Sequence, residues 1–380
     1  MRQLSHLLLL AALVVIAPRV EAAQPTELIP FLHMDAEVGY AGGIQFGRLR
    51  EQDTDTKYHD VAKYTHHRHE MDIDIEFGVC PMLELDLRFP IIFQDRLHYR
   101  SANDLSYNVS EERATMLGGY PLPSEELIDF KRGGFGDMEI GLQFSPFNES
   151  YDKNPAPATM LIEFTFLAPT GGDRYEVDSS GTAKPGNGGP GIRVGAAFSK
   201  RVPGGEPYFW ARYELTGRYD ANLINSSGEA TYGGPATLNP ADSIQVMLGT
   251  EIYAMNNPTS ATAINVDLYG GFSYHSWADI EAGSILPVTH NTTEGHLATT
   301  SEYLVPHFGL GLYIRPTPMV QIRLNTGLDY ETSHIVERVD MRNYEIATGM
   351  DTLRINFGIT VVGSFARPDK NASAASSPIP

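Results

Sequence analysis

The sequence contains a single cysteine and, after its first 22 residues, no long apolar run. Because Cys80 has no second cysteine to pair with, no intramolecular disulfide holds this fold together. No later apolar stretch approaches the roughly 18 residues that a membrane-spanning helix needs. If this chain crosses a membrane, it must therefore do so as a closed β-barrel, since lipid cannot satisfy the backbone hydrogen bonds of any other strand arrangement.

Positive charge is also scarce. The chain has 28 Lys and Arg against 47 Asp and Glu, which gives a formal net charge of −19. A nucleic-acid partner is recognised through clustered Lys and Arg at its phosphates. We therefore expect no nucleic acid among the partners of this protein.

The N-terminus has the pattern of a secretory signal peptide. Arg2 precedes an apolar run over residues 7–17, and small residues follow at Ala22 and Ala23. The residue directly after the expected cleavage site is not a cysteine, which argues against a lipoprotein. The sequence predicts a signal peptide over residues 1–22, one domain over 23–365 and a disordered, small polar tail over 366–380.

The stretch from Gly134 to Gly171 shows the pattern that dominates the rest of the chain. Within 137–145, apolar and polar side chains alternate, and 160–166 repeats this alternation after a turn rich in Pro, Asn and Asp. Successive strand residues point to opposite faces, so the two segments predict an amphipathic β-hairpin. A run of about ten residues suits a tilted strand that crosses a bilayer, although a soluble β-sandwich shows the same alternation.

The same alternation recurs along the chain and predicts twelve strands. They are expected at residues 32–46, 70–77, 83–89, 137–145, 160–166, 192–199, 208–218, 244–252, 264–275, 307–315, 320–329 and 353–365. We therefore predict an all-β fold, a closed antiparallel up-and-down transmembrane barrel.

The lengths of the connections favour this barrel over a soluble sandwich. Long connections at 48–66, 96–134, 170–188, 221–241, 279–302 and 333–350 alternate with brief turns near 81, 150, 204, 257 and 317. Outer-membrane barrels have short periplasmic turns and long outer loops, and an even strand count leaves both termini in the periplasm. We expect the protein in the outer membrane of a Gram-negative bacterium, in contact with outer-membrane lipid.

The polar faces of the predicted strands carry unequal charge. The earlier strands direct an acidic wall toward the lumen, formed by Asp35, Glu37, Glu70, Asp72, Asp74, Glu76, Glu84, Asp86, Asp137, Glu139 and Glu163. The later strands supply a largely basic wall, formed by Arg193, Arg212, Arg218, Arg315, Arg323 and Arg354. This pattern predicts either a hydrated lumen with a transverse field that favours cations or dipolar solutes, or salt bridges that close a narrow barrel. Twelve strands lie between filled barrels of about eight strands and open ones of about sixteen, so both alternatives stay open.

Two segments of the central hairpin resemble a bacterial family. The stretch Gly134-Phe135-Gly136-Asp137, and the stretch 166–171 that closes the next strand, are similar to outer-membrane proteins named after the meta-cleavage pathway of phenol degradation. The resemblance implies a barrel and, by family association, uptake of aromatic or other small apolar compounds. The motif residues that we expect to shape strand and turn geometry are Gly136, Asp137, Pro169 and Gly171.

Several residues suggest other chemistry. The histidines His66, His67 and His69 beside Glu70 invite a metal site, and Asp53 with Asp55 gives a weaker calcium signal, but solvated loop ends explain both better. Ser273 and His275 have the spacing of a Ser and His pair in outer-membrane phospholipases, yet no orienting acid or amide is identifiable.

We therefore predict no metal, no cofactor and no enzymatic activity. The leading hypothesis is passive passage of a small-molecule solute. The alternative is a structural or adhesive barrel with a plugged lumen, whose long outer loops, such as 96–134 and 279–302, bind a partner.

Overall fold

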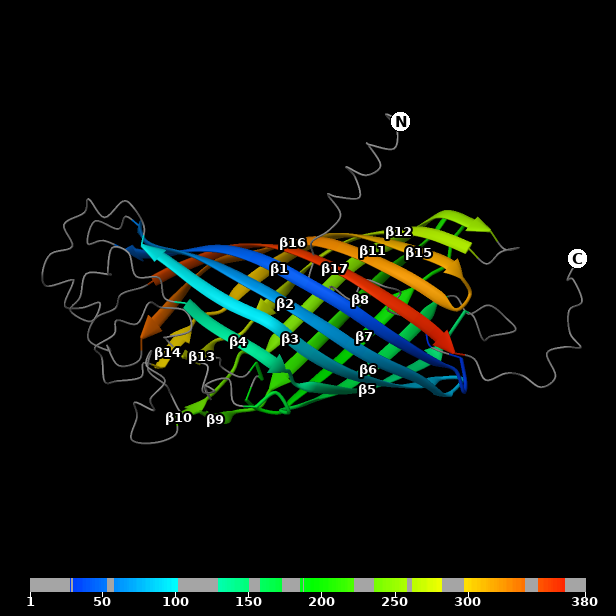
Figure 1. The fold of residues 1–380 in the computed structure, drawn as a ribbon, viewed down its shortest axis with the longest axis horizontal. Coiled ribbons are helices and arrows are strands. Elements are labelled where there is room, and N and C mark those ends of the chain that lie inside the picture. Colours follow the sequence, from blue (N-terminus) through cyan, green and yellow to red (C-terminus); the bar gives the residue numbers. More distant parts are fainter. Residues whose placement is uncertain are drawn as a thin grey trace, which may run out of the picture.

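The computed structural model describes residues 28, 30–52, 58–101, 129–149, 158–172, 185–186, 188–221, 236–257, 262–281, 297–338 and 348–365. Within these residues the chain is all-β, and twelve antiparallel strands close into one barrel (Figure 1), which confirms the predicted fold. The predicted signal peptide and the C-terminal tail lie outside the described residues. The described part of the chain contains no helix that could cross a membrane.

The barrel strands follow one another around the wall in chain order. They are β1 (Met34–Gln52), β2 (Tyr58–Cys80), β3 (Leu83–Ser101), β5 (Met138–Phe147), β6 (Thr159–Ala168), β7 (Gly191–Ser199), β8 (Gly205–Thr216), β11 (Ser243–Asn257), β12 (Thr262–His275), β15 (Tyr303–Thr317), β16 (Val320–Arg338) and β17 (Thr348–Phe365). The first and last strands pair with each other, from Met34 opposite Phe365 to Glu51 opposite Thr348. This pairing closes the sheet, so the barrel has no open edge.

Five short strands lie at one end of the barrel. β4 (Asp129–Phe135) pairs with the C-terminal part of β3, whereas β5 pairs with its N-terminal part. β9 (Tyr219–Ala221) and β10 (Ala236–Leu238) form a separate two-stranded ribbon. β13 (Ala278–Glu281) pairs with β14 (Leu297–Thr300), which also pairs with β16. We call this end, to the left in Figure 1, the long-loop end. The opposite end, which holds the turns near Pro81, Gly204 and Pro318, is the short-turn end.

The wall is much longer on one side than on the other. β1, β2, β3, β16 and β17 have 18 to 23 residues, whereas β5, β6 and β7 have 9 or 10. The sequence predicted long connections over 48–66, 96–134 and 333–350, but strand structure enters each of them. Charged and polar side chains occupy both faces of these extensions, for example Lys63 on one face of β2 and His66 on the other, so the alternation that marks a strand is lost there.

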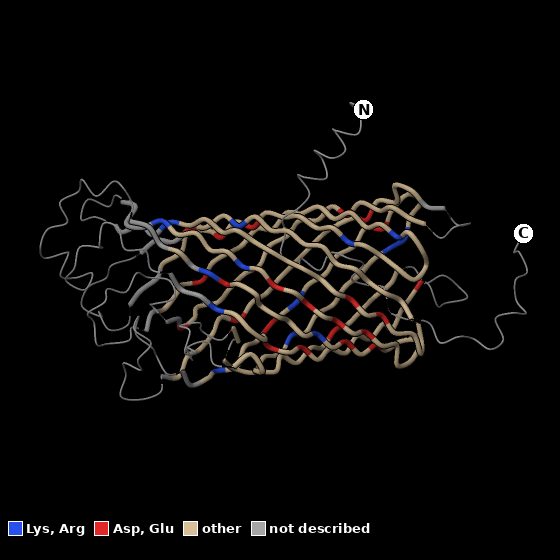
Figure 2. Tube along the Cα trace, viewed as in Figure 1, with Lys and Arg blue, Asp and Glu red and all other residues tan. Residues whose placement is uncertain are grey.

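The barrel has apolar side chains outside and charged side chains inside. Phe308 and Leu248 are 65% and 61% exposed, whereas Asp267 and Glu37 are 0% and 1% exposed. Charged residues occur along the wall between the two ends (Figure 2). The alternation in the sequence produces this inversion, because a closed sheet directs every second side chain inward.

The motif residues around Gly136 lie where β4 gives way to β5. The Asp137 carboxylate accepts a hydrogen bond from the backbone N–H of Gly171 at 2.9 Å, and the Thr170 hydroxyl oxygen accepts one from the N–H of Met138 at 2.8 Å. A Cβ at Gly171 would lie 2.9 Å from the backbone carbon of Gly136, so the two segments approach too closely for a side chain. Asp137 was expected on a strand, but β5 begins at Met138 and Asp137 connects the β4–β5 break to the turn after β6.

Candidate functional site: the barrel interior

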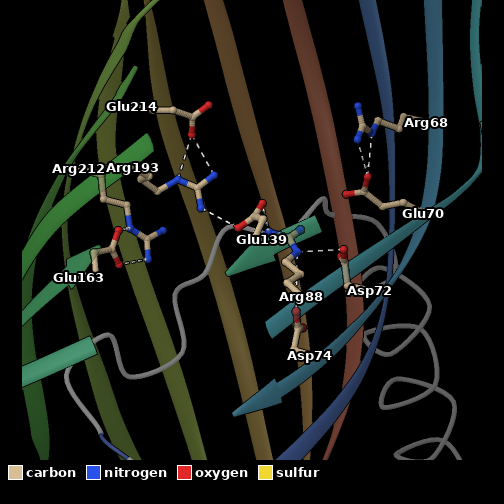
Figure 3. Close-up of polar contacts among 10 residues, drawn as sticks. All are labelled: Arg68, Glu70, Asp72, Asp74, Arg88, Glu139, Glu163, Arg193, Arg212 and Glu214. Carbon is tan, nitrogen blue, oxygen red and sulfur yellow. Dashed lines mark hydrogen bonds and ion pairs between the residues drawn. The ribbon is translucent and has the colours of Figure 1, made fainter. Parts of the chain in front are cut away.

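The acidic residues of the earlier strands gather around Arg88 (Figure 3). On β3, Arg88 lies 3.1 Å from Asp72 and 3.8 Å from Asp74, both on β2, and 3.3 Å from Glu139 on β5. Asp72 and Asp74 are almost fully buried. A buried carboxylate needs a cation or hydrogen-bond donors, and one guanidinium with several N–H groups serves three carboxylates here.

The ion-pair network continues around the wall. Arg193 on β7 lies 2.9 Å from both Glu139 and Glu214, and Arg212 on β8 lies 2.6 Å from Glu163 on β6 (Figure 3). Glu139 therefore connects Arg88 to Arg193, so residues of the predicted acidic and basic walls pair with each other.

These ion pairs run along the wall and do not cross the lumen. Arg193 reaches across β6 to Glu139, and Arg323 on β16 reaches across β17 to Glu37 on β1, at 2.8 Å. Strands that lie opposite each other in a barrel of twelve are six positions apart, whereas these partners are at most two apart. The salt bridges described here therefore do not close the barrel by joining opposite walls.

The expected lumen residues differ in their burial. Buried acids are Glu37, Glu70, Asp72, Asp74, Glu84 and Glu163, and half-buried ones are Asp35, Glu76, Asp86, Asp137 and Glu139. Half-buried arginines are Arg193, Arg212, Arg315, Arg323 and Arg354. Arg218 is exposed beyond the end of β8, where it donates a hydrogen bond to Asn239 at 3.0 Å. The strand expected over 208–218 ends at Thr216, and this end explains the position of Arg218.

Tyrosines from two strands, β8 and β15, meet at a buried carboxylate on a third strand, β12. The Tyr208 hydroxyl donates to both oxygens of Asp267, at 3.1 and 3.0 Å, and the Tyr313 hydroxyl lies 3.2 Å from one of them. The ring of Tyr208 covers Gly249, where a Cβ would be 2.3 Å from the ring carbon that carries the hydroxyl. A glycine on the neighbouring strand thus makes room for an aromatic ring that lies against it.

Leu28 packs into the same part of the interior. Its side chain is buried in a cluster with residues from five barrel strands. The other members are Leu161, Ala197, Tyr208, Trp210, Met247 and Tyr269. The segment that precedes β1 therefore contributes an apolar side chain to a buried cluster inside the barrel.

The histidines that suggested a metal site point in different directions. His66 lies 2.5 Å from Asp95 and 3.3 Å from Gln45, whereas the His69 ring bonds the exposed Tyr40 hydroxyl at 2.7 Å. Within the described residues, no group of three or more His, Cys, Asp or Glu is placed to hold a metal ion. Asp53 and Asp55 lie outside these residues.

Comparison with known proteins gives structural likenesses alone. No family model matches the chain, and no curated protein matches it either. An outer membrane channel from Pseudomonas putida F1 is 16% identical, with 90% of this chain and 99% of that chain covered and a TM-score of 0.48.

Two further solved structures are more distant. A Pseudomonas aeruginosa FadL homologue is 9% identical, with 87% of this chain and 90% of that one covered and a TM-score of 0.38. The outer membrane protease OmpT from Escherichia coli is 8% identical, with coverages of 90% and 100% and a TM-score of 0.36. These likenesses assign no function.

The buried tyrosine cluster and the packing of Leu28 were not predicted from the sequence. Tyr208 and Trp210 were expected on the polar face of their strand, where the structure buries them. Their convergence with Tyr313 depends on the register between strands that are far apart in the chain. The sequence did contain one signal for this cluster, which is the glycines at inward strand positions. A large ring on the neighbouring strand can lie against such a glycine, as Tyr208 does against Gly249.

Proposed function

We propose that this protein is an outer-membrane barrel through which small solutes pass passively, without a cofactor. The observation that supports this most strongly is the inverted burial, with Phe308 and Leu248 exposed outside and Asp267 and Glu37 buried inside. In water, such a large apolar exterior would associate or aggregate, whereas in lipid it is the stable arrangement. The short turns at one end fit the periplasmic side of an outer membrane.

The charged and aromatic side chains of the interior support a proposal for the class of solute. Carboxylates outnumber arginines along β1 to β6, and the hydroxyls of Tyr208 and Tyr313 meet at Asp267 inside the barrel. Cations and polar molecules that carry an aromatic ring would find favourable charge and stacking surfaces there. The resemblance of the central hairpin to the phenol-pathway family favours aromatic compounds within this class.

Single-channel recording in planar bilayers tests the proposal. We expect the purified, refolded barrel to conduct ions with a cation preference, and liposomes that contain it to admit small aromatic cations. A barrel that inserts but neither conducts nor admits any such solute would contradict the channel.

The packing around Leu28 favours a second candidate, a plugged barrel with a structural or adhesive role. Leu28, Trp210 and Met247 are each less than 5% exposed, so this region has little free space in the described conformation. The two candidates give opposite results in the same recording, because a permanently plugged barrel does not conduct.

A further inference from the structure

Three polar side chains on neighbouring strands form a connected line inside the barrel. Ser273 lies on β12, His307 on β15 and Asp329 on β16. Ser273 Oγ is 2.6 Å from His307 Nε2, and His307 Nδ1 is 2.7 Å from Asp329 Oδ1. All three residues are buried.

The strand ladders hold these residues in register. His307 is directly opposite Asp329 in the β15–β16 ladder, and it is opposite Gly271, two residues before Ser273, in the β12–β15 ladder. Residues two apart on a strand share a face, so all three side chains point to the same side of the sheet. Because two ladders fix the geometry, it does not depend on a loop.

The hydrogen bonds also fix the proton positions. A carboxylate accepts hydrogen bonds, so the bond to Asp329 places the imidazole proton on His307 Nδ1. Nε2 then carries a lone pair, and the Ser273 hydroxyl donates to it. The side-chain amide of Asn356 donates to the other oxygen of Asp329, which holds the carboxylate in place. This is the proton arrangement of a serine nucleophile with its general base.

Other buried serines of the described chain have different partners. The Ser199 hydroxyl donates to the Glu206 carboxylate at 2.5 Å, and the Ser145 hydroxyl donates to the backbone carbonyls of Phe147 and Met160. Neither of these bonds includes an imidazole oriented by an acid. Ser199 therefore offers a matched control, a buried inward serine that forms a strong hydrogen bond without a histidine.

We propose that Ser273, His307 and Asp329 form a catalytic triad that hydrolyses small carboxylic esters inside the barrel. Ser273 Oγ bonds to the ester carbonyl carbon as His307 Nε2 takes the hydroxyl proton, and the carbonyl electron pair moves onto oxygen. The tetrahedral intermediate collapses, the bond to the alkoxy oxygen breaks, and His307 gives the proton to the leaving alcohol. Water then repeats these steps on the acyl-serine and releases the carboxylic acid. Asp329 is the positioning residue.

Aromatic residues next to the triad indicate which esters fit. His275 is two residues beyond Ser273 and stacks on Tyr303 with 4.7 Å between ring centroids, and Tyr303 stacks on His334 at 4.5 Å. Two strand residues span about 7 Å, so this stack borders the triad on its long-loop side. Flat side chains at that distance suit an ester with an aromatic ring. The proposal goes beyond passive passage and requires only that the ester reach the interior.

The test uses the full-length barrel refolded in detergent, with phenyl acetate as substrate and a fluorophosphonate as the covalent probe. In the probe reaction, Ser273 Oγ forms a bond to phosphorus and fluoride leaves. We expect the adduct on the peptide that contains Ser273, and its loss in Ser273→Ala. His307→Gln should slow ester hydrolysis about 10²-fold or more, because general base catalysis contributes this much. Ser199→Ala should leave both reactions unchanged.

Asp329 needs a readout that separates positioning from folding. Asp329→Asn should lower kcat by at least about tenfold with little change in KM, since the amide favours the wrong imidazole tautomer. Asp329→Glu should restore part of the rate. Each variant is first checked for the folded barrel by its heat-modifiable mobility in a detergent gel.

Two results would overturn the triad. One is a folded wild-type barrel without a probe adduct at Ser273, whether or not it conducts ions. The other is ester hydrolysis that persists in folded Ser273→Ala. A barrel that forms the adduct but does not conduct would support the triad and contradict the channel, so the two proposals fail separately.

Discussion

Arg323 and Glu37 lie 286 positions apart in the chain, yet an Arg323 nitrogen and a Glu37 carboxylate oxygen are 2.8 Å apart inside the barrel. Arg323 belongs to β16 and Glu37 to β1, with β17 between them. The ion pair thus spans the strands where the two ends of the sheet meet. Glu37 is almost completely buried, and Arg323 is one of its polar partners.

Removal of the Arg323 charge should destabilise the closed barrel. We expect Arg323→Met to lower the free energy of unfolding by about 3 kcal/mol, because the Glu37 carboxylate is left buried without its cation. Urea unfolding of the barrel in lipid vesicles, followed by tryptophan fluorescence, measures this change. In the double variant Glu37→Gln/Arg323→Met much of the loss should be recovered, and an equal loss in both variants would contradict the pairing.

Charge changes around Arg88 should alter ion selectivity in both directions. Neutralising Asp72, Asp74 and Glu76 together should reduce the cation preference of the channel, and Arg88→Gln should increase it, since each changes the local potential in the lumen. The reversal potential in a KCl gradient reports both effects. If neither change moves it, these side chains do not line the path of the ions.

Leu28 should restrict passage through the interior. In Leu28→Asp a charge is placed within the apolar cluster of Trp210 and Met247, and we expect this segment to leave the cluster and conductance to rise. Phe31→Asp is the matched control, because Phe31 is 50% exposed and should have little effect. Equal conductance in wild type and Leu28→Asp would show that Leu28 does not control the path.

The two tryptophans of the chain offer a direct test of inside and outside. Trp210 is 3% exposed in the interior, whereas Trp277, between β12 and β13, is 45% exposed. Brominated lipid quenches indoles that contact it. We expect quenching in Trp210→Phe, which retains Trp277, and little in Trp277→Phe. Strong quenching of Trp210 would place that strand in the opposite orientation.

The strands were predictable from sequence because each one has its own alternation. For β5, β6 and β17, the apolar face points outward and the polar face points to the interior, so the period of two is visible in each strand alone. The extensions of β2 and β3 were missed, since near the long-loop end both faces are polar. Short strands such as β9 have only three residues, too few to show a period.

The side-chain partners were not predictable in the same way. Sequence spacing associated Ser273 with His275, but the Ser273 hydroxyl bonds His307 and the His275 ring stacks on Tyr303. On a strand, residues two apart share a face yet lie about 7 Å apart, so hydrogen-bond partners come from neighbouring strands. Their identity depends on the register of the ladders, which a single sequence does not specify.

The pairing of β1 with β17 has a consequence for biogenesis. Until the last strand arrives, β16 and β1 both present unpaired backbone groups, which neither lipid nor a partner strand satisfies. The nascent barrel therefore cannot be completed strand by strand in the bilayer, and its slowest event should be the meeting of two segments from opposite ends of the polypeptide. An assembly factor that covers the unpaired edges of β1 and β16 until β17 pairs with them would protect the chain from aggregation.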